Sequence, residues 1–352
     1  MNLPWRSQSD ARHIGSCDCG RAVRREAARE GVDVSERFRV FITEPKVHPA
    51  VAHLREIADV RQGPSDRRMD ERELSGELRD AHAVLITSRD RVTGAMIQGA
   101  ARLRVIAKFG ARPENVDWDA ARRRGVRILW APEANSDSVA EYTVLLILAH
   151  LRRILQAVHH LRAGGWRNTF ETGRELRGRT VGLIGLGNVG ARVARCLGGF
   201  EVTLLGCDPA VSGERAATIG VRLAALPDLL AQSDVVSLHA LATPETRHLI
   251  DEGALRRMKR NALLVNTARG ALVDEDALAR ALGQGWIGGA CLDVFAEEPV
   301  AASHPLLGAP RTIASPHIAA QTVEAQDREV TQTIEDVIRV LLGGEPVYSP
   351  ET

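Results

Sequence analysis

The sequence predicts an α/β protein of two domains, and three observations support this fold class. Short runs of apolar and β-branched residues alternate with helical patterns from residue 38 onward. One strand leads directly into a Gly-x-Gly-x-x-Gly turn and then into a helix, in the segment TVGLIGLGNVGARVARCL. A longer helical pattern begins near Ser136 and separates two sets of strands. At 352 residues the chain is long enough for each set to bury its own core.

Composition favours a small-molecule partner. The formal net charge is +1, and Lys and Arg are mixed evenly with Asp and Glu, so no sustained field points to nucleic acid or to a membrane surface. The five cysteines are an odd number in a long chain, which fits reduced thiols in the cytoplasm better than a disulfide framework. We find no apolar run of about 18 residues and no signal-peptide pattern, so we expect a cytoplasmic protein.

The first part of the chain predicts an extension followed by a small α/β domain. Residues 1–36 are polar and arginine-rich, with little apolar periodicity. Cys17 and Cys19, with His13 nearby, could bind a metal, but no second ligand pair stands at a usual zinc spacing, so we predict no metal site. Strands are predicted at the start of FRVFITEP and at three later segments: 83–88, 104–110 and 126–132.

The segment 137–161 predicts one long helix that links the domains. Ser136 or Ser138 can cap its N-terminus, and apolar residues recur through Leu155. The cofactor domain is then expected to occupy 137–317.

The glycine motif predicts a dinucleotide site. Gly185 allows a tight turn, Gly187 lets the backbone approach a pyrophosphate, and Gly190 lets strand and helix pack closely. The helix N-terminus adds unpaired N–H groups that suit an anion. The motif residues expected to bind the cofactor are Gly185, Gly187, Asn188, Val189 and Gly190.

The next strand, VTLLGCD, ends at Asp208. This carboxylate can accept hydrogen bonds from a ribose diol and would repel a phosphate on that ribose. Pro209 and Ala210 supply no cation to receive such a phosphate, so NAD is favoured over NADP. The alternative is an ordinary glycine turn with a surface aspartate.

Four further strands predict a shared rim at their carboxyl ends: 235–240, 262–270, 288–295 and 312–318. That rim would carry His239, Arg269 and Asp293, followed by Glu298 and His317. Taken singly, Glu298 before a proline could equally be a solvated loop residue, and His317 after Pro316 could equally be a satisfied histidine at a strand end.

Four motifs in this order carry a family resemblance: GLIGLGNVG, LLVNTARGALVDEDAL, LDVFAEEP and SPHIAAQT. They resemble the D-isomer-specific 2-hydroxyacid dehydrogenases, over roughly residues 38 to 345. The resemblance implies a Rossmann-type NAD-binding domain inserted into a flavodoxin-like substrate domain made of 37–136 and 318–352, with a C-terminal helix at about 321–343. It also implies a homodimer, because the helix at 137–161 resembles the family's dimer element.

The resemblance places the family's catalytic trio on Arg269, Glu298 and His317. Reduction of a 2-oxo acid needs an anchor for the carboxylate, which the arginine fork can supply, and a proton donor, which a histidine can be near neutral pH. A glutamate beside the histidine would favour the imidazolium and fix its orientation. Further cofactor contacts are implied at four positions, of which Asp293 would hold the nicotinamide carboxamide: His239, Thr267, Ala268 and Asp293.

The first domain departs from the family pattern. In KFGARPENVD, Arg112 stands where the family usually has a glycine against the substrate carboxylate, and Pro113 follows it. Together with Arg89, Arg112 could bind a second anionic group of the substrate; alternatively, Pro113 turns Arg112 into solvent. The expected substrate contacts are Arg89, Gly110, Ala111 and Arg112. Because the chain ends soon after the last predicted helix, we expect no appended regulatory domain.

Other functions on the same scaffold remain as alternatives. Formate dehydrogenases resemble this layout but have a glutamine where Glu298 stands, which argues against that activity. Corepressors of the C-terminal binding protein type keep the trio and sense NADH as interaction proteins, so the trio alone does not exclude an NADH-sensing role. A peptide-binding role would need long disordered flanks, and the sequence offers only a short polar extension. The sequence therefore favours a dehydrogenase.

Overall fold

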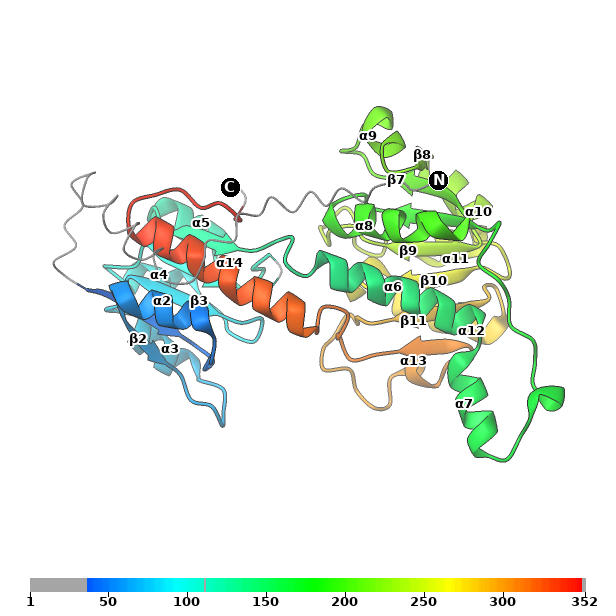
Figure 1. Ribbon diagram of the computed structural model, residues 1–352, viewed down its shortest axis with the longest axis horizontal. Helices are drawn as coiled ribbons and strands as arrows, with labels where there is room; N and C mark the ends of the chain where they lie inside the picture. The colour runs from blue at the N-terminus through cyan, green and yellow to red at the C-terminus, as the bar shows by residue number, and fades with distance from the viewer. Residues whose placement is uncertain (1–36, 111, 350–352) are drawn as a thin grey trace, which may run out of the picture. The chain divides into compact units, whose positions relative to one another are not determined.

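The structure, a computed structural model, describes residues 37–110 and 112–349 (Figure 1). The chain divides into two compact units. Unit 1 runs to Ala134 and resumes at Asp327, and unit 2 spans Asn135–Gln326. The predicted cofactor domain, 137–317, ends earlier than unit 2, because the loop after His317 is bonded into unit 2 through the backbone N–H of Ala319. The predicted extension and its Cys17 and Cys19 lie outside the described residues.

Unit 1 contains a parallel sheet of five strands in the order β2-β1-β3-β4-β5, which is the flavodoxin-like order. This confirms the predicted α/β class. The strands and helices are β1 (Phe38–Ile42), α2 (Pro49–Ile57), β2 (Ala58–Gln62), α3 (Glu71–Leu78), β3 (Ala83–Ile86), α4 (Gly94–Gly99), β4 (Val105–Lys108), α5 (Trp118–Arg123), β5 (Arg127–Trp130) and α14 (Val323–Leu341).

Helices cover both faces of this sheet. One face packs against α2 and α14, whose Leu54 and Ile334 are fully buried among the strand residues. The other face packs against α3, α4 and α5, with Leu78 and Ile97 fully buried there. The central strands are buried on both faces, as expected for a parallel sheet covered by helices.

Unit 2 contains a parallel sheet of seven strands in the order β12-β11-β10-β9-β6-β7-β8. The chain starts in the middle with β6, moves out to β8 and then crosses to β9 on the other side, as in a Rossmann sheet. The elements are α6 (Ser136–Leu151), α7 (Ile154–Arg162), β6 (Thr180–Ile184), α8 (Asn188–Leu197), β7 (Thr203–Cys207), α9 (Gly213–Ala217), β8 (Val221–Leu223), α10 (Leu226–Gln232), β9 (Val235–Leu238), α11 (Glu252–Arg257), β10 (Leu263–Asn266), α12 (Glu275–Gln284), β11 (Gly289–Leu292), α13 (Pro305–Gly308) and β12 (Thr312–Ala314), with 3-10 turns at Arg167–Thr169, Gly198–Phe200 and Gly270–Leu272.

Two helical layers enclose the unit 2 sheet. Helices α6 and α8 bury Ile147 and Leu197 against one face. Helices α10, α11 and α12 cover the other face, where Leu229 and Leu278 are fully buried. The carboxyl ends of the strands stay uncovered by these layers, so the loops that follow the strands form one edge of the sheet.

The prediction of one long helix at 137–161 is wrong. The segment forms α6 and α7, bent by 56° at a break where Arg153 adopts the left-handed conformation (φ 54°). Neither Ser136 nor Ser138 caps α6, because the N-cap is Asn135, which makes no side-chain cap bond. Within the described ranges no single helix is long and apolar enough to cross a membrane; α6 and α7 meet that length and composition only when taken together across their bend.

Candidate active site

Four neighbouring strands of unit 2 carry predicted site residues just past their carboxyl ends. His239 follows β9, Thr267 to Arg269 follow β10, and Asp293 follows β11. His317 lies beyond the end of β12. Since the strands are parallel neighbours, these residues share one edge of the sheet with the glycine turn after β6.

His317 and Glu298 form the closest ionisable pair at this edge. The ring Nδ1 of His317 lies 2.6 Å from Oε2 of Glu298. The other carboxylate oxygen, Oε1, accepts a hydrogen bond from the backbone N–H of Phe295 at 3.0 Å. The carboxylate is thus fixed at both oxygens, and the histidine keeps Nε2 for another partner. Both side chains remain accessible, with 49% and 36% of their surfaces exposed.

The Arg269 loop is held by a buried asparagine that the sequence reading did not single out. Asn266, the last residue of β10, accepts a bond from the Ala268 N–H at 3.0 Å and donates to the carbonyl of Arg269 at 2.9 Å. The Arg269 guanidinium in turn donates through Nη1 to the Ala268 carbonyl at 2.7 Å. A buried amide at the end of a strand is the sequence signal that could have identified this support.

Gly270 brings the arginine loop against the glutamate loop. A Cβ atom at this position would lie only 1.9 Å from the carbonyl carbon of Phe295 and 2.2 Å from the Ala296 nitrogen. Only glycine permits this approach of two backbones. The loop that carries Arg269 is therefore packed directly on the start of the loop that leads to Glu298.

Asp293 is fully buried, and its carboxylate bonds the loop around His317. Oδ1 accepts from the Ser315 hydroxyl at 2.6 Å and from the Ile318 N–H at 2.9 Å, while Oδ2 accepts from the Ala319 N–H at 2.8 Å. The predicted contact of Asp293 with a nicotinamide carboxamide stays a prediction. Ser315 was also not singled out from the sequence.

The glycine turn has the shape that a dinucleotide needs. Gly185 has φ +90°, and a Cβ there would lie 2.6 Å from the Ala240 nitrogen, while a Cβ at Gly190 would lie 2.1 Å from the Gly185 carbonyl oxygen. A Cβ at Gly187 would meet nothing within 4 Å. Gly187 is also the N-cap of α8 and gives it no side-chain cap bond. The turn is therefore tight where protein packs on it and open where an anion would approach the helix.

Two more side chains near this turn fit a cofactor. Asp208 accepts bonds from the N–H groups of Leu186, at 2.8 Å, and Ala210, at 2.9 Å, which leaves each oxygen a further acceptor site. Burial lowers the pKa of His239 to about 4, so its ring is neutral at pH 7. Its Nε2 lies 2.9 Å from the Ser237 hydroxyl, and its Nδ1 is shielded from solvent without a partner among the described residues. An unpartnered buried nitrogen of this kind suits a ligand contact.

Thr267 lines the same edge more deeply. It is 8% exposed, and its hydroxyl lies 2.9 Å from the Thr143 hydroxyl on α6. Its own side chain is thus engaged within the protein.

The predicted substrate residues belong to unit 1. Arg89 is exposed and pairs with Glu44 at 2.9 Å. Gly110 has φ +107°, a conformation that favours glycine. The guanidinium carbon of Arg112 lies 4.3 Å from the centroid of the Trp118 ring, and Ala111 lies outside the described residues. The structure thus places Arg89 and Arg112 at the same carboxyl edge of the unit 1 sheet, each with a partner of its own.

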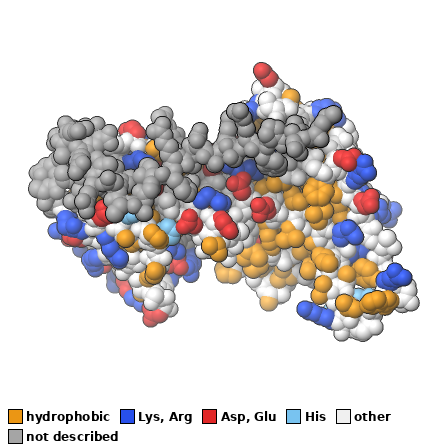
Figure 2. Space-filling model, viewed as in Figure 1, with side chains coloured by type: hydrophobic (Ala, Val, Ile, Leu, Met, Phe, Trp, Pro, Cys, Tyr) orange, Lys and Arg blue, Asp and Glu red, His pale blue; other side chains and the backbone are white. Residues whose placement is uncertain are grey.

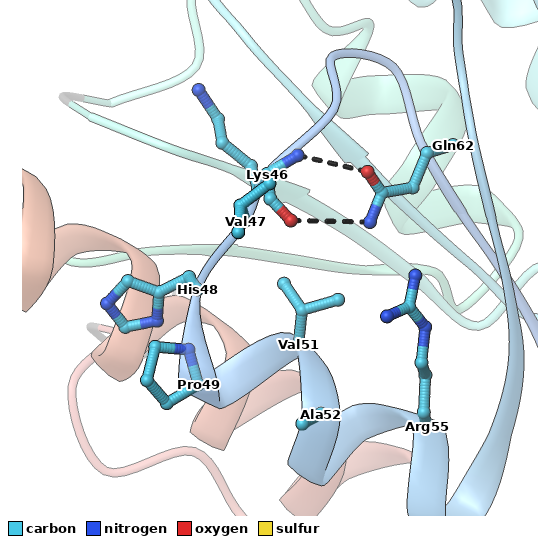
Figure 3. A pocket seen from close by; sticks show the side chains of 8 residues that line it. All are labelled: Lys46, Val47, His48, Pro49, Val51, Ala52, Arg55 and Gln62. Carbon is cyan, nitrogen blue, oxygen red and sulfur yellow. Dashed lines mark hydrogen bonds between the residues drawn. The ribbon is translucent and has the colours of Figure 1, made fainter.

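A basic pocket of about 400 Å³ lies beside the ends of β1 and β2 (Figure 3). Its walls include Lys46, His48 and Arg55, together with Gln62, whose amide makes two hydrogen bonds to the Lys46 backbone, at 3.0 and 3.4 Å. None of the predicted site residues lines it.

Comparison with known proteins identifies the family. Residues 144–319 match the family described as D-isomer specific 2-hydroxyacid dehydrogenase, NAD binding domain. The glyoxylate reductase of Thermofilum pendens is 39% identical over 316 residues, which cover 88% of this chain and 93% of that relative. The D-3-phosphoglycerate dehydrogenase of Mycobacterium tuberculosis is 41% identical over 308 residues, covering 87% of this chain but only 57% of that relative.

A solved structure agrees with these relatives. The glyoxylate reductase from Paecilomyes thermophila superposes with a TM-score of 0.81 at 28% identity, and the match covers 89% of this chain and 98% of that one. The chain belongs to the D-isomer-specific 2-hydroxyacid dehydrogenase family, and it is an NAD-dependent oxidoreductase that acts on CH–OH groups.

Proposed function

We propose that the chain interconverts a small 2-oxo acid and its D-2-hydroxy acid, with Arg269 as the carboxylate anchor and His317, paired with Glu298, as the acid–base group. The observation that carries this proposal is the 2.6 Å contact between His317 and Glu298 at the same sheet edge as Arg269. Steady-state reduction of glyoxylate with NADH tests it.

The chain's own groups each have a task in reduction. Bound NADH supplies the hydride to the carbonyl carbon. Arg269 neutralises the substrate carboxylate with a planar fork of N–H donors. His317 donates a proton from Nε2 to the developing alkoxide, while Glu298, held by the Phe295 N–H, keeps Nδ1 protonated and the ring oriented. In oxidation the same histidine takes the proton back.

Glu298→Gln should lower the rate of reduction. The variant loses the carboxylate that lies 2.6 Å from Nδ1 of His317, so the ring loses its charged partner and its fixed orientation. We expect kcat to fall about 10- to 100-fold, the size of one lost hydrogen bond to a charged group, with the dissociation constant of NADH near the wild-type value. Glu297→Gln, which removes the charge of the preceding residue, is the matched control and should leave kcat unchanged. Wild-type kcat in Glu298→Gln would separate the glutamate from the acid–base step.

We propose that NAD is held by the glycine turn, Asp208 and the rim of β9 to β11. The residues are Gly185, Gly187, Asn188, Val189, Gly190, Asp208, His239, Thr267, Ala268 and Asp293. The open space at Gly187 and the free acceptor sites of Asp208 support the pyrophosphate and ribose contacts.

We propose that Arg89, Gly110, Ala111 and Arg112 contribute the substrate contacts of unit 1. A cation–π contact engages the charge of the guanidinium and leaves its N–H groups able to donate, so the contact with Trp118 leaves Arg112 able to bind an anion. A second cation beyond Arg269 would suit a substrate with a second anionic group.

Arg112→Gly should therefore discriminate between substrates. The variant should lose roughly 1.5–3 kcal/mol of binding to a dianionic 2-oxo acid such as oxaloacetate, the range for hydrogen bonds to charged groups. Glyoxylate, which has no second anion, is the internal control and should be barely affected. Equal losses on both acids, or no loss on either, would remove Arg112 from substrate selection.

We propose a homodimer that covers α7. This helix has no buried residue, and it exposes Leu155 (54%) and Leu161 (59%). Figure 2 shows hydrophobic side chains gathered over α6 and α7. An exposed apolar patch of this kind is typical of an interface.

A charge placed on this helix should dissociate the dimer. Light scattering should give the monomer mass for the double variant Leu155→Glu/Leu161→Glu, because burying an unpaired carboxylate in the dimer interface is unfavourable. Val347→Glu, at another exposed apolar position of the chain, should keep the dimer mass. A monomeric wild type would reject the proposal outright.

A further inference from the structure

Two loops at the carboxyl edge of the unit 1 sheet are tied together by a buried aspartate. One loop follows β1 and begins at Thr43, and the other follows β3 and begins at Thr87. Oδ2 of Asp90, a residue only 8% exposed, accepts from the Thr43 hydroxyl at 2.6 Å and from the Thr87 N–H and hydroxyl at 2.7 and 3.0 Å. The Thr43 N–H also donates to the Leu85 carbonyl at 2.9 Å. These bonds hold the two loops side by side.

A carboxylate on the first of these loops faces two cations. Oε1 of Glu44 lies 2.9 Å from Nη2 of Arg89, on the second loop. The other oxygen, Oε2, lies 3.6 Å from Nζ of Lys46. That ammonium is 5.8 Å from the centroid of the Phe109 ring, which begins the loop after β4. Glu44, Lys46 and Arg89, here called the Glu44 cluster, therefore lie at the edge that carries the proposed substrate contacts of unit 1.

The carboxylate lowers the positive charge of the Glu44 cluster. Two cations and one carboxylate leave a formal charge of +1, where the cations alone would carry +2. Both distances are well inside the Debye length of about 8 Å at physiological ionic strength, so salt does not cancel these interactions. An anion that approaches Arg89 must displace the carboxylate of Glu44 or remain close to a like charge.

We infer that Glu44 is a specificity-determining residue, whose carboxylate competes for Arg89 with a second anionic group on the substrate. It disfavours dianionic 2-oxo acids relative to monoanionic ones. The inference rests on the proposed function, in which Arg89 is a substrate contact. Arg112 lies over a neutral ring and keeps its charge for such a group, whereas Arg89 has to exchange Glu44 for it. Discrimination of this kind comes from a repulsive element near the substrate.

A role in stability explains the pair less well. The side chains of Glu44 and Arg89 are 38% and 68% exposed, and ion pairs with this exposure contribute little to the free energy of folding. The two loops are already joined through the buried carboxylate of Asp90. Removing the charge of Glu44 should therefore leave the fold intact and alter the electrostatic potential at this edge.

Glu44→Gln should raise the selectivity for dianionic substrates. Glutamine keeps the size of the side chain and an acceptor for Arg89, so the substitution removes the charge alone. The ratio of kcat/KM for oxaloacetate to kcat/KM for glyoxylate should rise roughly 3- to 5-fold, the size of one exposed ion pair. The rise should come from a lower KM for oxaloacetate and should shrink in high salt.

Two further variants make the test specific. Glu77→Gln is the matched control, because Glu77 also pairs with an arginine of unit 1, Arg61 at 2.7 Å, and it should leave the ratio at the wild-type value. The Glu44→Gln change should also be made in an Arg89→Met background. There it should raise the ratio less than in the wild-type background, because the cation that it releases is gone.

Kinetics with the two acids decide the outcome. An unchanged or lower ratio in Glu44→Gln overturns the inference, and so does an equal rise in Glu77→Gln or in the Arg89→Met background. A wild type that reduces neither acid would reject the proposed function and the inference with it. Wild-type turnover with an unmoved ratio rejects the inference alone, so the two failures are distinguishable.

Discussion

His317→Asn should abolish most of the reduction of 2-oxo acids. Asparagine cannot donate a proton to the alkoxide, and general acid catalysis typically contributes about 100- to 10,000-fold. The loss should appear in kcat, measured by NADH oxidation at saturating glyoxylate. The dissociation constant of NADH should stay near the wild-type value, because the ring contacts Glu298 and not the glycine turn.

The control for this variant is another histidine that faces a glutamate. His304 lies 3.3 Å from Glu275 through Nε2 and caps α13, a position that asparagine also fills well. His304→Asn should keep nearly all activity. Activity retained in His317→Asn, or lost equally in both variants, would contradict the assigned role.

Asp208→Ser should raise the KM for NADH and weaken the preference over NADPH. The carboxylate is expected to accept bonds from both ribose hydroxyls, and each lost bond to a charged group costs about 1.5–3 kcal/mol. Removing the charge also removes the repulsion of a ribose phosphate. The kcat/KM for NADPH should therefore fall less than the kcat/KM for NADH, or should rise. The ratio of kcat/KM for the two cofactors measures the effect.

The same substitution at another aspartate of the sheet controls for structural damage. Asp234 also accepts a backbone N–H, that of Thr180 at 2.9 Å, but it lies before β9 and bonds Lys259. Asp234→Ser should lower stability without changing the NADH to NADPH ratio. A wild-type NADH to NADPH ratio in Asp208→Ser would contradict the proposed contact between Asp208 and the ribose.

The glycine turn and the central strands could be predicted because their sequence requirements are local. Gly185 requires a positive φ and Gly190 lies against the backbone of the same turn, so the motif alone specifies the geometry. The buried strands read as continuous apolar runs, as β10 does with LLVN. Because neighbouring parallel strands end at one edge of a sheet, these runs also predicted that Arg269, Asp293 and His317 lie at one edge of the unit 2 sheet.

Other features depend on tertiary contacts that the sequence does not display. The edge strands β2 and β8 were not predicted, because ADVRQ and VRL lie half in solvent and lack an apolar run. The break before α7 has no glycine or proline to mark it. Ser315 bonds Asp293, which lies 22 residues earlier in the chain. The tight approach of Gly270 to Phe295 is likewise visible only in the folded chain.

Steady turnover of NADH with glyoxylate, measured on the wild type and on His317→Asn at equal enzyme concentration, tests whether the chain is a dehydrogenase that uses His317 as its proton donor. We expect multiple turnovers by the wild type, at a rate that the variant lowers about 100-fold or more while it still binds NADH. Tight NADH binding by both proteins without turnover on glyoxylate, hydroxypyruvate or oxaloacetate would contradict it and would favour an NADH-sensing interaction protein.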